Sequence, residues 1–446
     1  MKTNYSINHF FIIVLTVIGL LASSCQKEPE TTISADQFAG DVTHQWYDLS
    51  LKLTQKTSGF APPVAARAFG YTGVALYESV VAGMPDHGSL SGQLNGLQII
   101  NSAQPKEYEY NWALTANAAM AYMVKNLYAN TTDELKAEIT ALEESQYNQY
   151  SAQSSEAVID RSVNLGVSIA KQVFDWSKTD GGHEAYNNLF PATYTPPVGP
   201  QYWVPTAAGQ KPLLPYWGNN RPFIAGCTAV SQPAPPAAFS TEPSSDFYQQ
   251  AYEVYTTGQN LSAEQTVIAK YWADGGGTVT PPGHSISVLK QLLGNENATL
   301  SKSADAYCKM GIALSDAFTS CWKCKYDYSL LRPITYINQY IDPEWTTSIG
   351  TPPFPEYTSG HSVQSGAAQI ILEHLFGSNT AFTDNTHANR TDIDGTPRNF
   401  SSFDEFAQEA AISRLYGGIH YRDAIEVGVA QGKSVGQMVL TLSFLQ

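Results

Sequence analysis

Three short segments between Lys325 and Asp423 carry side chains that could hold one tetrahedral oxyanion. They read KYDYSLLRP, YTSGH and SRLYGGIHYRD. In the first, Lys325 and Arg332 are seven residues apart, so both would project from one face of a helix that runs through them. Pro333 would then stop or kink that helix. Converging cations are costly without an anion to neutralise them, so this segment predicts part of an anion site.

The second segment places hydrogen-bond donors beside a titratable ring. Ser359 supplies a hydroxyl, and Gly360 supplies a backbone N–H that a ligand can approach closely because glycine has no side chain. His361 follows directly and could give or take a proton near neutral pH. These residue types predict a turn that binds an oxyanion and has an acid/base next to it.

The third segment pairs a cation with a histidine across a turn. Arg414 lies six residues before His420, with Gly417 and Gly418 between them, so the two side chains could converge. Asp423 lies three residues after His420 and could accept a hydrogen bond from one ring nitrogen, which would fix the tautomer. Phosphate and vanadate are the anions that such a cluster suits.

In order and spacing, these segments match the K-x6-R-P, P-S-G-H and S-R-x5-H signature. The chain is identified as a member of the superfamily that joins type 2 phosphatidic acid phosphatases, bacterial acid phosphatases and vanadium-dependent haloperoxidases, a resemblance that covers the C-terminal part of the chain in detail. It implies that His361 is the acid/base and that His420 is the metal ligand or the nucleophile that accepts phosphate. The residues that would bind the equatorial oxygens are Lys325, Arg332, Ser359, Gly360 and Arg414.

Two positions depart from the signature. Thr358 stands where the family usually has proline, which loosens the turn but removes no chemical group. Asp423 lies three residues after His420, whereas the phosphatases usually place an aspartate four residues after it. Because both spacings share a helix face, we expect Asp423 to orient His420 as a catalytic residue.

The resemblance leaves two chemistries open, because vanadate and phosphate share charge and tetrahedral shape. In a haloperoxidase, His420 would bind vanadium, Lys325 would polarise peroxide for attack by halide, and His361 would manage the protons. In a phosphatase, His420 would attack a phosphomonoester and His361 would protonate the leaving oxygen. A third alternative is a surface lipoprotein that binds an oxyanion without turnover, which the presence of both histidines disfavours.

Phe354 favours the haloperoxidase alternative. It lies seven residues before His361, where the resemblance to fungal-type chloroperoxidases places an aromatic ring over the halide pocket, although a simple core aromatic would also suit this position. A TPPGH element that ends at His284 resembles bacterial members of this branch, and we expect His284 to pack or hydrogen-bond and not to bind a ligand. The expected cofactor is vanadate, with phosphate able to occupy its site, and the expected substrates are hydrogen peroxide and halide.

The N-terminus resembles a bacterial lipoprotein signal. Lys2 is followed by an apolar run over residues 10–21 and then by Ala-Ser-Ser before Cys25, which would become the lipidated residue. The run is short for a membrane span, and an ordinary secretory signal is the alternative. We expect residues 1–25 to be the signal and 26–35 a tether, with the protein in the periplasm or on the outer-membrane surface and attached only by its lipid. The net charge of -15 argues against nucleic acid as a partner.

Four further cysteines are present, and in an oxidising compartment an even number favours disulfides. They are Cys227, Cys308, Cys321 and Cys324, for which three pairings are open. The Cys321–Cys324 spacing also resembles a redox or zinc motif, but no second CxxC accompanies it, so we expect a structural role.

Helical periodicity dominates the chain and strand signals are weak, which predicts an all-α bundle of the vanadium haloperoxidase and acid phosphatase type. We expect an N-terminal helical region over 36–180 and a C-terminal helical catalytic domain over 244–446. Between them, residues 181–243 are rich in proline and aromatic residues, and we expect an ordered wrap that helps to shape the mouth of the site.

Overall fold

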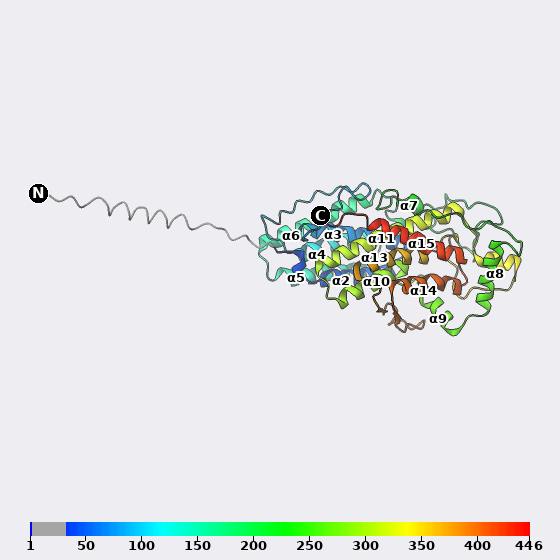
Figure 1. The fold of residues 1–446 in the computed structure, drawn as a ribbon. Coiled ribbons are helices and arrows are strands. Elements are labelled where there is room, and N and C mark those ends of the chain that lie inside the picture. Colours follow the sequence, from blue (N-terminus) through cyan, green and yellow to red (C-terminus); the bar gives the residue numbers. More distant parts are fainter. Residues whose placement is uncertain (2–32) are drawn as a thin grey trace.

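The computed structural model describes residue 1 and residues 33–446. The expected signal peptide with Cys25, and the tether as far as residue 32, therefore lie outside the described residues. Nearly all of the regular structure in the described part is helical, which confirms the all-α prediction (Figure 1). Among the described helices, none is both long enough and apolar enough to cross a membrane.

The helices follow one another along the chain, and one short hairpin interrupts them. The α-helices are α2 (Asp41–Lys56), α3 (Pro62–Val80), α4 (Trp112–Leu127), α5 (Asp133–Ser151), α6 (Glu156–Ser177), α7 (Cys227–Val230), α8 (Asp246–Gln259), α9 (Ala263–Tyr271), α10 (Thr280–Asn295), α11 (Leu300–Tyr328), α12 (Pro333–Tyr340), α13 (Gly360–Phe376), α14 (Phe403–Tyr416) and α15 (Arg422–Val439). The 3-10 turns are η1 (Ala35–Gln37), η2 (Val81–Gly83), η3 (Ala185–Asn187) and η4 (Trp217–Asn219). Strands β1 (Phe382–Asp384) and β2 (Arg398–Phe400) pair antiparallel.

The packing of α3 against α11 forms the centre of the molecule. Every residue of α3 from Pro63 to Val80 is buried, as expected for a helix with apolar or small residues on all sides. Two glycines let the backbones approach closely. A Cβ on Gly73 would lie 2.6 Å from the carbonyl oxygen of Tyr307, and a Cβ on Gly311 would lie 2.7 Å from that of Phe69. This packing fixes α11, whose C-terminal end carries the predicted lysine segment.

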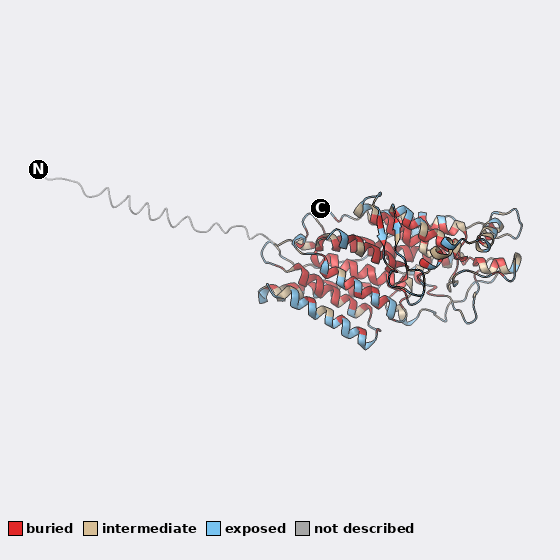
Figure 2. Ribbon diagram, turned by 90° about the horizontal axis from the view of Figure 1, so that it is seen from below, coloured by how far each residue is buried: buried red, intermediate tan, exposed pale blue. Residues whose placement is uncertain are grey.

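One large hydrophobic core runs from α2 to the last helices, so the predicted N-terminal and C-terminal regions share it (Figure 2). A smaller core lies among α8, α12, α14 and α15. Helix α13 packs against α11, α14 and α15, which brings the elements of all three predicted segments together.

Residues 181–243 contain only the 3-10 turns η3 and η4 and the four-residue helix α7. Their backbone bonds directly to the segments that carry the site. The Trp203 N–H donates to the Ser329 carbonyl at 2.7 Å, and the Leu213 N–H donates to the Pro353 carbonyl at 2.9 Å. The Leu331 N–H donates in return to the Gln201 carbonyl at 3.0 Å. These hydrogen bonds attach the proline-rich segment to the loops beside the site.

The expectation that one helix carries both Lys325 and Arg332 is wrong. Helix α11 ends at Tyr328, and Ser329 follows with a left-handed φ of 46°. Arg332 has extended backbone angles and is the N-cap of α12. The physical reason is Pro333, because the residue before a proline is sterically disfavoured in the helical conformation. The two side chains still approach the same place, but from two different elements.

The expected disulfides are also not found. All four cysteines of the described part, Cys227, Cys308, Cys321 and Cys324, are free and buried. Burial raises the pKa of each thiol, and the local contacts are those of small core residues. The Gln431 side chain, for example, donates to the Cys324 sulfur at 3.3 Å.

Candidate active site

Lys325 lies in the last turn of α11 and is fully buried. Its ammonium group donates to the carbonyl oxygens of Pro355 at 3.1 Å and Glu356 at 2.9 Å, and also to that of Thr358. Burial lowers the pKa of Lys325 to about 8. The lysine therefore ties α11 to the segment that leads into α13, and its charge is carried without a carboxylate in direct contact.

Arg332 connects three parts of the site. Its Nε donates to the Phe354 carbonyl at 2.9 Å, and its Nη1 donates to the Ile419 carbonyl at 2.8 Å. Nη1 also lies 3.1 Å from Nε2 of His420. The remaining nitrogen, Nη2, is buried and has no hydrogen-bond partner among the described residues. A buried guanidinium donor left free is costly, so this atom marks a place suited to an anionic acceptor.

The contacts of His420 fix its tautomer. An arginine nitrogen can only donate, so Nε2 of His420 accepts from Arg332 and carries no proton. Nδ1 lies 2.7 Å from Oε1 of Glu356 and therefore carries the proton of the neutral ring. Burial and the neighbouring cations Arg332 and Lys325 hold the pKa of His420 well below its usual value, which keeps the ring neutral.

Glu356, and not Asp423, orients His420. The Asp423 carboxylate accepts a hydrogen bond from the Gln250 side chain at 2.6 Å, away from the histidine. The expectation for Asp423 is wrong because His420 precedes α15 while Asp423 lies in its first turn, so the two do not share a helix face. Burial raises the pKa of Glu356 to about 7 against the opposing charges of Arg332 and Lys325.

Ser359 is the N-cap of α13, and Gly360 and His361 form its first turn. The helix N-terminus directs unpaired backbone N–H groups and a partial positive charge outward. A Cβ on Gly360 would meet no atom closer than 3.8 Å, so the space beside this turn is open. His361 lines the adjacent cavity, and within the described part of the chain its Nε2 has no hydrogen-bond partner. Burial and the charge of Arg414 hold the pKa of His361 well below its usual value.

Arg414 reaches the site from the last turn of α14. Its Nη2 donates to the carbonyl oxygens of Trp272 at 2.7 Å and Ala269 at 3.3 Å, while its Nε lies 3.1 Å from the Ser413 hydroxyl. Burial lowers the pKa of Arg414 to about 10, a value at which the guanidinium is still charged near neutral pH. The loop after α9 therefore sets the direction of this cation.

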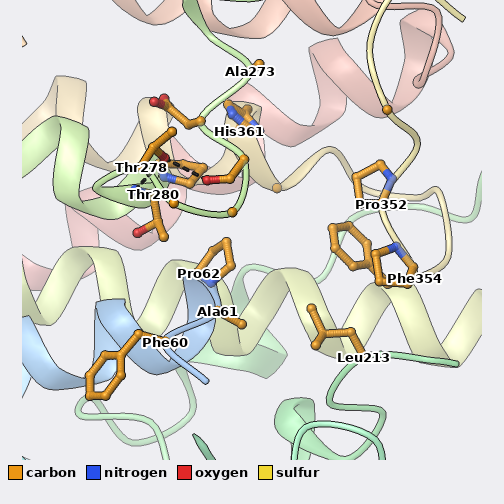
Figure 3. A pocket seen from close by; sticks show the side chains of 18 of the residues that line it. Phe60, Ala61, Pro62, Leu213, Ala273, Thr278, Thr280, Pro352, Phe354 and His361 are labelled. Carbon is orange, nitrogen blue, oxygen red and sulfur yellow. Dashed lines mark hydrogen bonds between the residues drawn. The ribbon is translucent and has the colours of Figure 1, made fainter. Parts of the chain in front are cut away.

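A cavity of about 680 Å³ opens onto these residues. Gly360, His361, Arg414 and His420 line one part of it, and the turn between α2 and α3 lines another. Figure 3 shows His361 on one side, Phe60, Ala61 and Pro62 facing it, and Phe354 with Leu213 at a further edge. The Phe354 ring centroid lies 5.0 Å from Nζ of Lys325 and 5.0 Å from Cζ of Arg332. The ring thus covers both cations at the cavity wall.

Comparisons with known proteins identify the family. A solved structure described as the first bacterial vanadium-dependent iodoperoxidase is 35% identical in sequence. The match covers 91% of this chain and 96% of the chain in that structure, with a TM-score of 0.81. The chain belongs to the vanadium-dependent haloperoxidase family. The family model "VCPO second helical-bundle domain" matches residues 338–444 of this haloperoxidase family member.

More distant proteins share part of the sequence or the fold. The vanadium chloroperoxidase of Curvularia inaequalis is 25% identical over 218 residues, which are 35% of this chain and 36% of that protein. The matched part thus spans about a third of the length of that relative. A holo-type bacterial vanadium-dependent chloroperoxidase shares the fold, with a TM-score of 0.63, 17% identity and coverage of 86% of this chain and 92% of its own.

The structure brings several of the predicted residues together: His361, His420 and Arg414 line one end of the cavity, and Arg332 lies against His420. The sequence prediction missed Glu356. The signal was an acidic residue five positions before His361, in the proline-rich segment that leads into the serine-glycine-histidine turn. It also gave no role to the C-terminal end of α9 and the residue after it, where the carbonyl groups of Ala269 and Trp272 hold Arg414.

Proposed function

We propose that this protein oxidises halide with hydrogen peroxide, using vanadate held at His420. The observation that carries the proposal is the state of His420: its Nδ1 proton is committed to Glu356, and its unprotonated Nε2 faces the Arg332 guanidinium. A neutral imidazole with one nitrogen free of a proton is the form that binds a metal.

The residues around His420 fit the cofactor. Among the described residues, the buried polar atoms near His420 that lack a partner include Nη2 of Arg332 and Nε2 of His361. Nη2 of Arg332 and the N-terminus of α13 offer donors for a tetrahedral oxyanion next to the ligand histidine, and the unprotonated Nε2 of His361 can accept a proton beside them. In this proposal the residues that would hold the oxyanion are Lys325, Arg332, Ser359, Gly360 and Arg414, with Lys325 acting through its charge because its N–H groups already bond to carbonyl oxygens. Bound vanadate supplies activation of peroxide toward halide.

His361 moves the protons in this proposal. Its depressed pKa keeps the ring neutral, so Nε2 can accept a proton from hydrogen peroxide as peroxide enters the cavity. The same atom can later return that proton to the departing oxygen. Lys325 holds the segment from Pro355 to Thr358 in place and contributes positive charge. Phe354 keeps water from the two cations that it covers and forms one wall for the halide.

Iodide is the halide that we propose as preferred substrate. The basis is the likeness to the structure described as an iodoperoxidase, which extends over almost the whole chain. Iodide is also the halide that is easiest to oxidise, so a site with few specific halide contacts suits it. A comparison of initial rates with iodide, bromide and chloride at one peroxide concentration tests this preference.

The decisive experiment measures halogenation of a phenolic dye by the metal-free protein before and after addition of vanadate. We expect activity only after vanadate is added, and we expect inorganic phosphate to suppress it by occupying the same site. Hydrolysis of a phosphomonoester is measured in parallel. Ester hydrolysis that vanadate inhibits, without vanadate-dependent halogenation, would overturn the proposal and make the protein a phosphatase.

We also propose that the protein is a lipoprotein at the bacterial cell envelope, anchored through Cys25. The support is the order of residues in the N-terminal segment, in which small residues follow an apolar run and precede the cysteine. Metabolic labelling with a fatty acid tests this proposal. Label should be incorporated by the native sequence and lost in Cys25→Ala, whereas equal labelling of both would contradict it.

A further inference from the structure

A second cluster, of buried histidines and carboxylates, lies next to the proposed active site. His284, near the start of α10, is fully buried between two carboxylates. Its Nδ1 lies 2.9 Å from Oδ2 of Asp274, and its Nε2 lies 2.7 Å from Oδ2 of Asp384. Nε2 of His387 lies 3.1 Å from the other oxygen of Asp274. The hydroxyl of Tyr271 donates to Asp384 at 2.8 Å.

The contacts of His284 require a charged ring. Both ring nitrogens face a carboxylate oxygen, and a neutral ring has only one N–H to donate. Although burial opposes the charge, Asp384 and Asp274 raise the pKa of His284 to about 10. The imidazolium also compensates the two buried carboxylates, which would be costly without it.

The cluster holds the loop that aims Arg414. Asp274 is a non-glycine residue with a left-handed φ of 42°, so its conformation needs support from its surroundings. The following residues Gly275–Gly277 line the cavity, and a Cβ on any of them would meet no atom within 4 Å. Packing at those positions therefore does not fix the loop. The Asp274 carboxylate anchors its start, while the Thr278 hydroxyl and the Gln55 side chain donate to the carbonyl oxygens of Gly275 and Gly277 farther along.

Trp272 connects the cluster to the site. Its ring stacks on the His284 ring, with centroids 4.5 Å apart and an angle of 15° between the planes. Its carbonyl oxygen accepts the 2.7 Å hydrogen bond from Nη2 of Arg414. The Trp272 ring nitrogen donates to Glu409 at 2.9 Å, so the ring is held from its edge as well as from its face. A displaced His284 would thus displace the carbonyl that directs Arg414.

We propose that His284, clamped by Asp274 and Asp384, is a positioning residue that sets the direction of Arg414 and thereby the affinity of the site for its oxyanion. The proposal rests on the proposed function only in that an oxyanion binds at Arg414. His284 touches no substrate. It acts through the ring and carbonyl of Trp272 and through the anchor at Asp274.

The test is a double-mutant cycle on oxyanion affinity, measured by equilibrium dialysis of the full-length, metal-free protein against vanadate and, separately, against phosphate. We expect His284→Gln to weaken vanadate binding roughly 10- to 100-fold, the range found when a residue that orients a metal-site ligand is lost. In the Arg414→Ala background the same change should have little further effect, because its action passes through Arg414. A purely structural role would weaken binding equally in both backgrounds and would overturn the proposal.

Matched variants keep the test decisive. Asp392→Asn is the control, because Asp392 lies in the same β1–β2 loop as His387 but is exposed and pairs with Arg390. It should bind vanadate as the wild type does. Tyr271→Phe removes one hydrogen bond to Asp384 and keeps the aromatic ring. It should also weaken vanadate binding, but by a smaller factor than His284→Gln does. It takes the place of His284→Gln in the cycle if that variant does not fold.

Two further outcomes would count against the proposal. If the wild type binds neither oxyanion, the proposed function and this proposal both fail, whereas unchanged affinity in a folded His284→Gln variant overturns this proposal alone. The ligand atoms of Asp274, His284 and His387 also lie within 4.8 Å of one another, a spacing that a metal ion could use. A stoichiometric transition metal in the purified protein would overturn the protonated cluster on which the proposal depends.

Discussion

The Nδ1 atom of His420 lies 2.7 Å from Oε1 of Glu356, and the same oxygen accepts the Tyr421 N–H at 3.0 Å. The carboxylate therefore fixes both the ring and the backbone that follows it. Carboxylates that accept from a metal-binding histidine commonly set its tautomer and increase its basicity. In this protein the partner comes from the segment before α13 and not from the residues next to His420.

Glu356→Gln should weaken vanadate binding. The amide keeps the shape of the side chain but loses the charge that supports the protonated Nδ1, so we expect affinity to fall about 10- to 100-fold. Isothermal titration of the metal-free protein with vanadate measures this change. Asp423→Asn is the matched control, since Asp423 contacts Gln250 and not His420, and its affinity should equal that of the wild type. A larger loss in Asp423→Asn than in Glu356→Gln would contradict the assignment.

His361→Ala should separate turnover from binding. The ring contributes an unpartnered Nε2 to the cavity and no charge, so its removal should leave vanadate affinity within a few-fold of the wild type. Turnover should fall about 10²- to 10⁴-fold, the usual contribution of a positioned acid/base. Steady-state halogenation and vanadate titration of the same preparation give both quantities. Loss of affinity as large as the loss of turnover would show that His361 is mainly a vanadate-binding residue.

Vanadate affinity should fall as pH rises through about 8, the pKa to which burial lowers Lys325. The protonated lysine attracts the anion and the neutral lysine does not, so its contribution is present below that pH and is lost above it. Lys325→Arg keeps the charge at high pH and is the matched comparison. The ratio of wild-type to Lys325→Arg affinity should decrease between pH 7 and pH 9, because the ionisation of vanadate affects both proteins alike. A constant ratio would show that Lys325 does not titrate in this range.

The four cysteines of the described part should all react as thiols. A protein denatured without reductant and treated with an alkylating reagent should carry label on Cys227, Cys308, Cys321 and Cys324 by mass spectrometry. The native protein should label slowly at these positions, because each thiol is buried and has a raised pKa. Any pair that stays unlabelled until a reductant is added is bridged, which would restore the original prediction.

The site could be predicted from the sequence because its chemistry is concentrated in three local segments with fixed spacings. The partner of His420 could not be predicted in this way, because Glu356 meets the histidine only through the packing of α13 against α15. The break between α11 and α12 could have been predicted from the sequence, because Arg332 directly precedes a proline. The cluster around His284 could not be predicted from the sequence. Its members come from the loop after α9, from α10 and from the β1–β2 hairpin, and only the fold places them together.

The charged state of His284 predicts a pH dependence of folding stability. The pKa of His284 is about 10 in the folded protein and near the ordinary histidine value of about 6.5 in the unfolded chain. The group therefore contributes its full stabilisation below about pH 6.5 and loses it as pH rises toward 10. The difference in unfolding free energy between the wild type and His284→Gln should shrink over this range by up to a few kcal/mol. Urea denaturation of both proteins at pH 6, 8 and 9.5 measures this difference in unfolding free energy. The pH-dependent contributions of Lys325 and of the buried arginines are present in both proteins and cancel when the two free energies are subtracted. A difference that stays constant with pH would mean that His284 is neutral in the folded protein.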